Sequence, residues 1–299
     1  MDGGVETTLV FLEGFELPCF ASFPLLERED GRAALRRYFA PYLDIARRHG
    51  KGFVLDACTW RASPFWGAQL GYSRERLAEA NRRCIGFLEE IQGREEGPGR
   101  PVVISAPVGP GGDAYDGSRR LTAGEAEAYH SWQVGVLAET AADIVAGMTL
   151  AHVEEAIGLV QASRAVGMPV AVSFTVETDG RLPSGQPLGE AIEQVDAETG
   201  GAPAYFMINC AHPTHFLPVF AAPGPWQRIL GIRANASAKS HAELDESDEL
   251  DDGDPHGLAG EYLRIRERLP HLTVLGGCCG TDHRHVAAIG DAWFASQPG

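Results

Sequence analysis

The stretch Leu272-Thr273-Val274-Leu275-Gly276-Gly277-Cys278-Cys279-Gly280 joins a short apolar run to two adjacent cysteines set between glycines. Such a run is typical of a short buried strand. Successive side chains of a regular strand point to opposite faces, so neighbouring cysteines can serve one site only where the backbone turns. Glycine permits the dihedral angles of such a turn. We therefore predict that a strand ends here and that the cysteine pair lies at its carboxyl end.

A third cysteine has the same setting. The apolar run Tyr205-Phe206-Met207-Ile208 leads into Asn209-Cys210, a polar step at the end of another predicted strand. We interpret Cys210, Cys278 and Cys279 as ligands of one zinc ion, although their spacing lacks the regularity of paired CxxC motifs. Two alternatives stay open at this point: a disulfide between the two neighbouring cysteines, or unrelated buried thiols.

Apolar runs recur along the whole chain, with helical patterns between them. The predicted strands are 52–57, 101–105, 143–146, 169–174, 205–210, 229–232 and 272–275. The predicted helices are 33–49, 74–92, 123–141, 153–166, 188–198, 257–269 and 282–296. This alternation is typical of a parallel sheet covered on both faces. Seven strands, with one more expected near the N-terminus, predict an α/β fold, a (β/α)8 TIM barrel that occupies residues 1–299 as a single domain.

The first strand is predicted to be shortened or irregular. Met1-Asp2-Gly3-Gly4 resembles the end of a strand, yet no strand precedes it, so the strand is either nearly absent or shifted into 8–11. An open doubly wound sheet is the alternative fold, but no GxGxxG motif follows any predicted strand. In a barrel the carboxyl ends of all strands open onto one face, where Cys210 and the cysteine pair can meet.

The composition excludes several kinds of partner. A net charge of −16 over 299 residues argues against nucleic acid and anionic membranes. No apolar run approaches the ~20 residues of a membrane span. Six cysteines without a recognisable signal peptide predict the reducing cytoplasm. The run 243–254 is rich in acids and has no base, which predicts a solvated loop.

Five motifs resemble those of one family. They are Asp2-Gly3-Gly4, Thr59-Trp60-Arg61-Ala62-Ser63, Val172-Ser173-Phe174 with Ser184-Gly185, Asn209-Cys210, and the Gly276–Gly280 motif. Together they resemble the homocysteine S-methyltransferase family, zinc-dependent barrels that include betaine– and S-methylmethionine–homocysteine methyltransferases. The resemblance implies that Cys210, Cys278 and Cys279 are catalytic zinc ligands. It also implies a role in methionine biosynthesis and places Asp2, Gly3 and Asn209 around the bound amino-acid thiol.

The implied chemistry agrees with the cysteine count. Three thiolates leave one of the four usual zinc positions open, as in catalytic sites. A free thiol of pKa ~8.5 is mostly protonated at pH 7, whereas a coordinated thiol is deprotonated by the metal. We expect a thiol such as homocysteine to accept a methyl group from a small onium donor, S-methylmethionine- or betaine-like. Folate and cobalamin domains are not expected in 299 residues. A homo-oligomer is compatible with the sequence.

Two positions depart from the family pattern. Met148 stands where the family usually carries a glutamate that helps to hold the ammonium group of the substrate. Arg61 stands where the family often has Tyr or Gln; it could bind a carboxylate bidentately or pair with a local acid. With Trp60, these residues complete the predicted substrate-binding set. Met148 and Arg61 together predict a thiol or donor that carries more negative and less positive charge than the usual pair.

Other roles remain open from the sequence. The alternatives to methyl transfer are a divergent zinc lyase or demethylase acting on another sulfur compound, and a non-catalytic zinc- or thiol-binding relative. Trp60, Trp66 and Trp132 could form an aromatic wall for an onium methyl group, with core packing as the alternative for at least two of them. His212 and His215 follow Cys210 closely, and His241 with the acidic run could cover the site.

Overall fold

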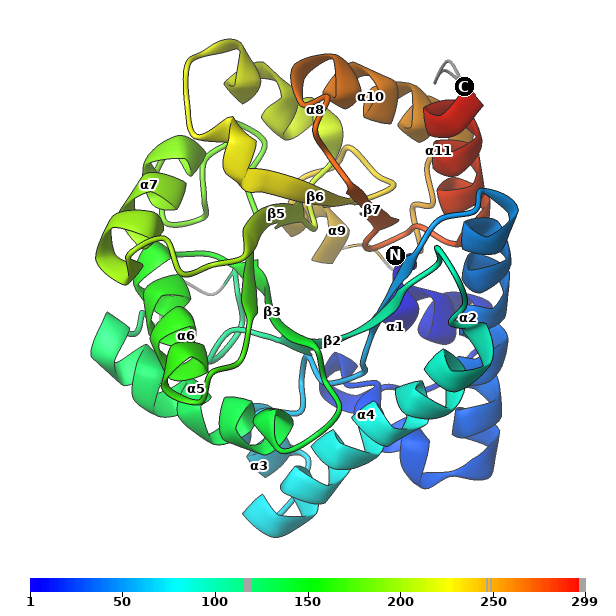
Figure 1. The fold of residues 1–299 in the computed structure, drawn as a ribbon, viewed down its shortest axis with the longest axis vertical. Helices are drawn as coiled ribbons and strands as arrows, with labels where there is room; N and C mark the ends of the chain where they lie inside the picture. The colour runs from blue at the N-terminus through cyan, green and yellow to red at the C-terminus, as the bar shows by residue number, and fades with distance from the viewer. Residues whose placement is uncertain (116–119, 246, 248, 296–299) are drawn as a thin grey trace.

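The computed structural model describes residues 1–115, 120–245, 247 and 249–295. Seven parallel strands form one sheet in which each strand pairs with its neighbours in chain order. The sheet curls into a ring with the helices outside it, a TIM-barrel-like α/β fold, as predicted (Figure 1). The strands are β1 (Phe53–Asp56), β2 (Val102–Val108), β3 (Ile144–Leu150), β4 (Val170–Phe174), β5 (Tyr205–Asn209), β6 (Ile229–Ala234) and β7 (Val274–Gly277).

All seven predicted helices are present. They are α2 (Glu29–Arg48), α4 (Arg74–Glu95), α5 (Ala123–Ala138), α6 (Val153–Ala165), α7 (Leu188–Thr199), α10 (Pro255–Arg268) and α11 (His283–Ala295). Shorter helices follow several strands, including α3 (Pro64–Gln69), α8 (Pro213–Phe216) and α9 (His241–Asp245). Residue 296, the predicted end of the last helix, lies outside the described residues. Within the described part, no helix is both long and apolar enough to cross a membrane.

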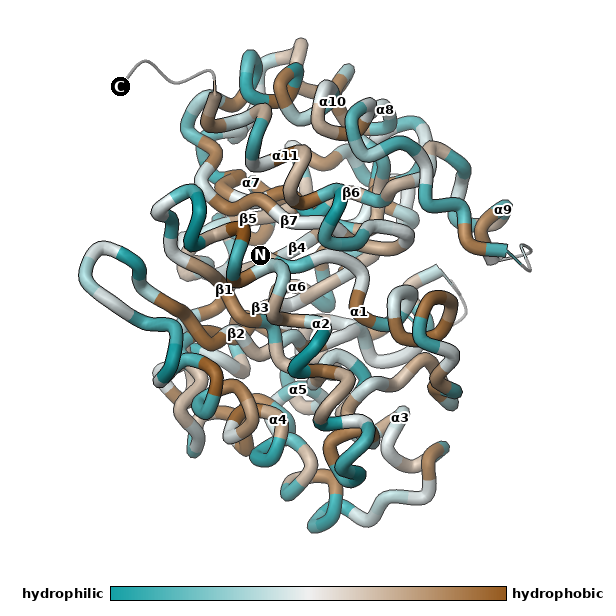
Figure 2. The backbone as a smooth tube through the Cα atoms, turned by 90° about the vertical axis from the view of Figure 1, so that its right-hand side faces the viewer, coloured by the Kyte–Doolittle hydropathy of each residue, from teal (hydrophilic) through white to brown (hydrophobic). Residues whose placement is uncertain are grey.

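The core explains why the strands are so apolar. Every residue of β3 and β4 is buried, because the helices cover one face of the sheet and the barrel interior covers the other. In Figure 2 brown is concentrated along β1, β2 and β3, and teal is frequent in the outer turns. Burial on both faces therefore leaves few polar positions along β3 and β4, and the two that occur, Thr149 and Ser173, lie next to the carboxyl ends.

The ring is not closed by a full strand. Neighbour order runs from β1 to β7, and within the described chain these two strands do not pair with each other. Met1 and Asp2 lie beside β7 instead: the Met1 amino group donates to the Leu275 carbonyl (2.7 Å) and the Gly277 amide to the Asp2 carbonyl (2.8 Å). Figure 1 shows the N-terminus inside the ring, next to β7. The prediction of a shortened first strand is confirmed, and the alternative in 8–11 is wrong because Thr8–Leu12 is helical.

Candidate metal centre and substrate cavity

The three predicted cysteines meet at the carboxyl end of the sheet. Cys210 directly follows β5, and Cys278 and Cys279 directly follow β7. Their sulfur atoms all lie within 4.8 Å of one another. Cys210 and Cys278 are joined as a disulfide in this structure, whereas the alternative bond between the two neighbouring cysteines is not formed. Because thiolates are the metal ligands, a bound ion requires the reduced form of this pair.

The backbone around the cysteines is tied to the neighbouring strand. Cys210 has a φ of 54°, a left-handed conformation that turns its side chain out of the strand register. Its amide donates to the Arg233 carbonyl (3.2 Å), and the Cys278 amide donates to the Ala234 carbonyl (2.8 Å). The Cys279 carbonyl accepts from the Ala236 amide (3.0 Å). Strand β6 thus fixes both cysteine segments, one on each side.

The N-terminal glycine motif packs directly on the cysteine motif. The Gly4 amide donates to the Thr281 carbonyl (3.0 Å), and the Gly280 amide donates to the Thr7 hydroxyl (3.2 Å). A Cβ added to Gly4 would lie 2.6 Å from the Cys278 carbonyl oxygen, so no other residue fits there without a shift. This close approach brings helix α1 (Val5–Thr7), at the start of the chain, to the cavity that the three cysteines line.

Asn209 connects the cysteines to β3 and β4. Its Oδ1 accepts from the Thr149 amide (2.9 Å) and the Ser173 hydroxyl (2.6 Å). Its Nδ2 donates to the Thr149 hydroxyl (2.8 Å) and approaches the Cys278 sulfur at 4.0 Å. The Thr149 hydroxyl lies 3.8 Å from the Cys210 sulfur. Asn209 therefore positions two of the three sulfurs, directly or through Thr149.

We expect Asn209→Ala to weaken metal binding without removing a ligand. The change deletes these hydrogen bonds, and losing an outer partner of a metal site typically costs about 10–100-fold in metal affinity. The measurement is a competition titration of the reduced protein with a zinc chelator. Asn235→Ala is the matched control, because Asn235 is buried at the same rim and its Oδ1 has no hydrogen-bond partner within the described residues. Equal zinc affinity in the two variants would contradict the assignment.

Two cavities meet at the cysteines. The inner cavity, of about 90 Å³, is lined by all three cysteines and lies within the barrel mouth. Its polar or thioether lining includes Asp2, Glu6, Asp56, Met148, Asn209 and Arg233. The outer cavity, of about 410 Å³, also reaches Cys210 and Cys279, and Trp60 lines both cavities. A small ligand could therefore contact the sulfurs from within while a second one approaches from outside.

Arg233 holds two carboxylates at the floor of the inner cavity. Its guanidinium pairs with Asp2 (2.8 Å) and with Asp56, and all three side chains are buried. The same guanidinium donates to the Gly3 carbonyl (2.8 Å), so Gly3 supports this cluster and does not itself line the cavity. Burial alone would lower the pKa of Arg233, but the two carboxylates outweigh it and raise that pKa. Burial raises the pKa of Asp56 to about 6, against the opposing effect of Arg233.

Arg61 lies in the wall of the outer cavity between two indole rings. Its guanidinium carbon is 4.1 Å from the ring centre of Trp60 and 3.8 Å from that of Trp66. Burial lowers the pKa of Arg61 to about 10, with Asp113 opposing the shift. Its Nε has no hydrogen-bond partner within the described residues. The alternative of a surface arginine paired with a local acid is wrong, since Arg61 is buried and forms no ion pair within the described chain.

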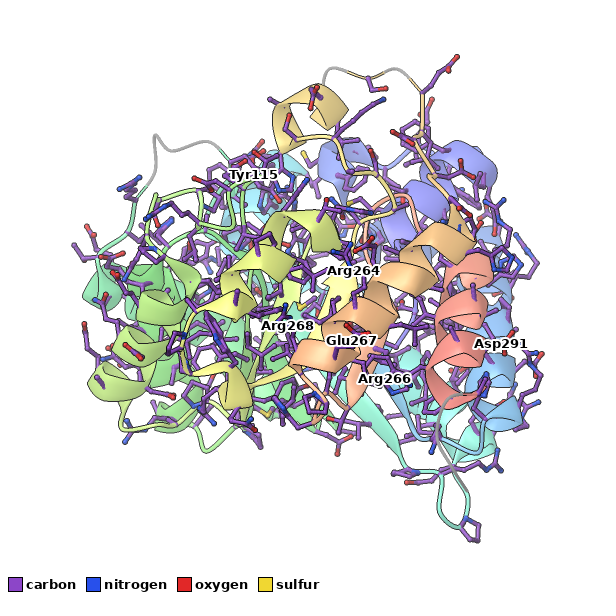
Figure 3. All side chains as sticks on the ribbon, turned by 90° about the horizontal axis from the view of Figure 1, so that it is seen from above. Tyr115, Arg264, Arg266, Glu267, Arg268 and Asp291 are labelled. Atoms are coloured by element: carbon purple, nitrogen blue, oxygen red, sulfur yellow. A yellow bond between two sulfur atoms is a disulfide. The ribbon has the colours of Figure 1, made fainter. Side chains whose placement is uncertain are left out.

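Tyr115, in the segment after β2, and His241, at the start of α9, both line the outer cavity. The Tyr115 ring stacks on the His241 ring, with 3.9 Å between the ring centres. Both contact the hydroxyl of Thr175, Tyr115 at 3.1 Å and His241 at 3.4 Å. Figure 3 shows Tyr115 at the same end of the molecule as α9, which begins at His241. Burial lowers the pKa of His241 to about 4, so this ring is neutral at physiological pH. Residues 246 and 248 of the acidic run lie outside the described residues.

Several other candidates lie away from the cavities. Trp132 packs against the core, and the guanidinium of Arg74 lies over its ring. For Trp132 the core-packing alternative therefore holds. His212 bonds with Thr214 at the start of α8, and the ring of His215 bonds with the Ala238 carbonyl. Neither histidine lines either cavity. Of the three tryptophans proposed to form an aromatic wall, Trp60 lines both cavities and the other two line neither. The ring of Trp66 packs on the guanidinium of Arg61.

Sequence reasoning missed four residues of the inner site: Glu6, Asp56, Thr149 and Arg233. Arg233 offered a signal, because it is a charged residue that directly follows the predicted strand 229–232 and stands between Ile232 and Ala234, where a buried charge requires a partner. Asp56 stands at the end of the first apolar run. Glu6 gave no signal, since only the packing of α1 against the cysteine motif brings it inside.

Fold and cluster together define a class: TIM-barrel-like proteins with a cysteine triad at the strand ends that could hold a metal ion. Within it, the chain belongs to the homocysteine S-methyltransferase family, because the model of the family "Homocysteine S-methyltransferase" matches residues 1–293. No individually curated protein sequence matches significantly.

The solved structures that resemble the chain include the homocysteine methyltransferase MmuM from Escherichia coli. Its oxidized form superposes with a TM-score of 0.74 at 19% identity, covering 96% of this chain and 93% of that one. The metallated form gives a TM-score of 0.73 at 18% identity, covering 96% and 94%. At these identities the likeness establishes the shared fold.

Proposed function

We propose that the protein is a zinc-dependent thiol S-methyltransferase, which moves a methyl group from a small onium donor to a thiol such as homocysteine. The observation that carries the proposal is the convergence of the Cys210, Cys278 and Cys279 sulfurs at the junction of two cavities. The family membership supports a small thiol and a methyl donor as substrates.

The cysteine triad fits zinc by its chemistry. Three sulfur ligands are a donor set that zinc accepts, and they leave one position for an exogenous ligand. A related structure, MmuM, has been solved in a metallated form. When bound, zinc would lower the pKa of a coordinated thiol so that its sulfur is a nucleophile at neutral pH. In this proposal Asn209 and Thr149 orient the protein sulfurs, and Asp2 borders the acceptor.

The outer cavity suits a cationic donor. Aromatic rings of Phe20, Trp60 and Tyr115 line it, and onium methyl groups bind favourably over such faces. The carboxylates of Asp113 and Asp251 line the same cavity and favour positive charge. Arg61, in the same wall, is proposed to bind a substrate carboxylate.

In the transfer, the acceptor sulfur gains the methyl group while the donor's bond to that methyl breaks and leaves its electron pair on the donor. The thiol proton passes to solvent.

The direct test is a mass-spectrometric screen of the reduced, zinc-loaded protein. Homocysteine and other small thiols are paired with S-methylmethionine or betaine that carries a trideuterated methyl group. We expect the labelled methyl on the acceptor sulfur with at least one pair, and no product from protein treated with chelator. Absence of a labelled thioether from every pair would overturn the proposal.

A further inference from the structure

Among the described residues, Glu6 is the acid of the inner cavity that forms no ion pair, although the more distant Arg233 and Arg61 act on it electrostatically. Asp2 and Asp56 line the same cavity, but both pair with Arg233. The Glu6 carboxylate accepts a hydrogen bond from the Ser22 hydroxyl at 2.8 Å, and no Lys, Arg or His of the described chain forms an ion pair with it. A partly buried carboxylate without an ion-pair partner favours a positive group beside it.

The backbone places Glu6 in the lining of the cavity that the three cysteines also line. It lies two residues after Gly4, whose close approach to the Cys278 carbonyl fixes the start of α1. Next to Glu6 in sequence, the Thr7 hydroxyl accepts from the Gly280 amide. The position of this carboxylate at the cavity is therefore set by the same contacts that fix the cysteine motif.

We infer that Glu6 is a specificity residue that binds the ammonium group of the thiol acceptor. The inner cavity holds both Glu6 and the three sulfurs, so a short amino thiol could place its sulfur at the cysteines and its ammonium at this carboxylate. The inference rests on the proposed function. It deepens that function by naming the residue of this chain that holds the ammonium group of an amino thiol.

The surroundings of Glu6 support a cation. Burial removes solvation from the Glu6 carboxylate and so raises its pKa, while the Ser22 hydrogen bond opposes this shift. A ligand cation would stabilise the anion in place of the lost water. Met148 lines the same cavity and offers only a thioether and a methyl group. The inner cavity therefore has an acid without an ion-pair partner, Glu6, although position 148 has none. The expectation of a substrate with less positive charge, drawn from Met148 and Arg61 together, did not take this carboxylate into account.

The test compares two thiols that differ only in the ammonium group, homocysteine and 4-mercaptobutanoate. Their affinities are measured by calorimetry on the reduced, zinc-loaded protein without any methyl donor. We expect the wild type to prefer homocysteine by about 10–100-fold, the range of a hydrogen-bonded charge contact. Glu6→Gln should abolish this preference by weakening homocysteine binding and leaving 4-mercaptobutanoate binding unchanged.

Further variants separate recognition from folding. Glu6→Asp keeps the charge but shortens its reach, so an intermediate preference is expected even if Glu6→Gln does not fold. The double variant Glu6→Gln/Met148→Glu should restore part of the preference, because it returns an acid to the same cavity. Glu13→Gln is the matched control: Glu13 pairs with Arg37 outside the cavity, and no change is expected.

The outcomes distinguish the inference from the proposed function. A wild-type preference that survives in Glu6→Gln overturns the role of Glu6 and leaves the methyltransferase proposal intact. Equal binding of the two thiols by the wild type does the same. Binding of neither thiol by the zinc-loaded wild type overturns the proposed function, and this inference with it.

Discussion

Replacement of Cys279 by serine is expected to abolish both stable zinc binding and methyl transfer. The sulfur of Cys279 is one of three that lie within 4.8 Å of one another, so its loss leaves two sulfur donors for the ion. A hydroxyl is a poor substitute for a thiolate, and the expected loss of affinity exceeds the roughly 10–100-fold typical of outer partners. Metal content after dialysis and the labelled-methyl assay are the measurements.

Cys19→Ser is the control for this experiment. Cys19 is half-buried and lines neither cavity, so its replacement should leave the metal content at the wild-type value. The Cys210→Ser and Cys278→Ser variants should match Cys279→Ser, although in the described structure they also break the bond between Cys210 and Cys278. Full zinc occupancy in Cys279→Ser would show that Cys279 is not a ligand.

Replacement of Arg233 by methionine is expected to destabilise the fold by about 3–5 kcal/mol, the usual cost of leaving a buried charge without its partner. The change strands the carboxylates of Asp2 and Asp56 in the barrel floor. Urea unfolding measures the loss. Arg228→Met is the matched control: Arg228 also pairs with an acid, Asp196, but at a partly exposed position where about 0–1 kcal/mol is expected. Similar losses in the two variants would contradict a special role for Arg233.

The stability of the Arg233→Met variant is expected to fall with rising pH over a wider range than that of the wild type. Burial raises the folded-state pKa of Asp56 from 3.8 to about 6, and Arg233 opposes this shift. An acid with a raised pKa favours the folded state while it is protonated, so its contribution is complete below pH ~4 and is lost as pH rises towards 6. Without Arg233 that folded pKa rises further. The stability of Arg233→Met should therefore keep falling above pH 6, where the contribution of Asp56 in the wild type is already lost. Parallel pH profiles for the two proteins would refute this.

Much of the fold could be predicted because its signals are local. The apolar runs that became β1 to β7 are continuous, since parallel strands are covered on both faces, and each was identified within a few residues of its bounds. The three cysteines were predictable for a related reason. Each follows a strand directly, and the barrel brings all carboxyl ends together whatever their separation in sequence.

The remaining features depend on packing that no local pattern encodes. The first strand reduces to Met1 and Asp2 beside β7, a result of backbone pairing between the two ends of the chain. Arg61 is buried with its guanidinium packed on the rings of Trp60 and Trp66. The sequence shows that these residues are near one another in the chain, but not that their side chains stack. Glu6 entered the cavity only through the close approach of Gly4 to the cysteine motif.

The central claim is that the sulfurs of Cys210, Cys278 and Cys279 together bind one metal ion and leave a place for a substrate thiol. X-ray absorption on the reduced, zinc-loaded protein tests it most directly, recorded with and without homocysteine. We predict three sulfur ligands at about 2.3 Å in the free protein and a fourth when homocysteine is added. A zinc shell dominated by nitrogen and oxygen, or one that does not change on adding the thiol, would contradict the account.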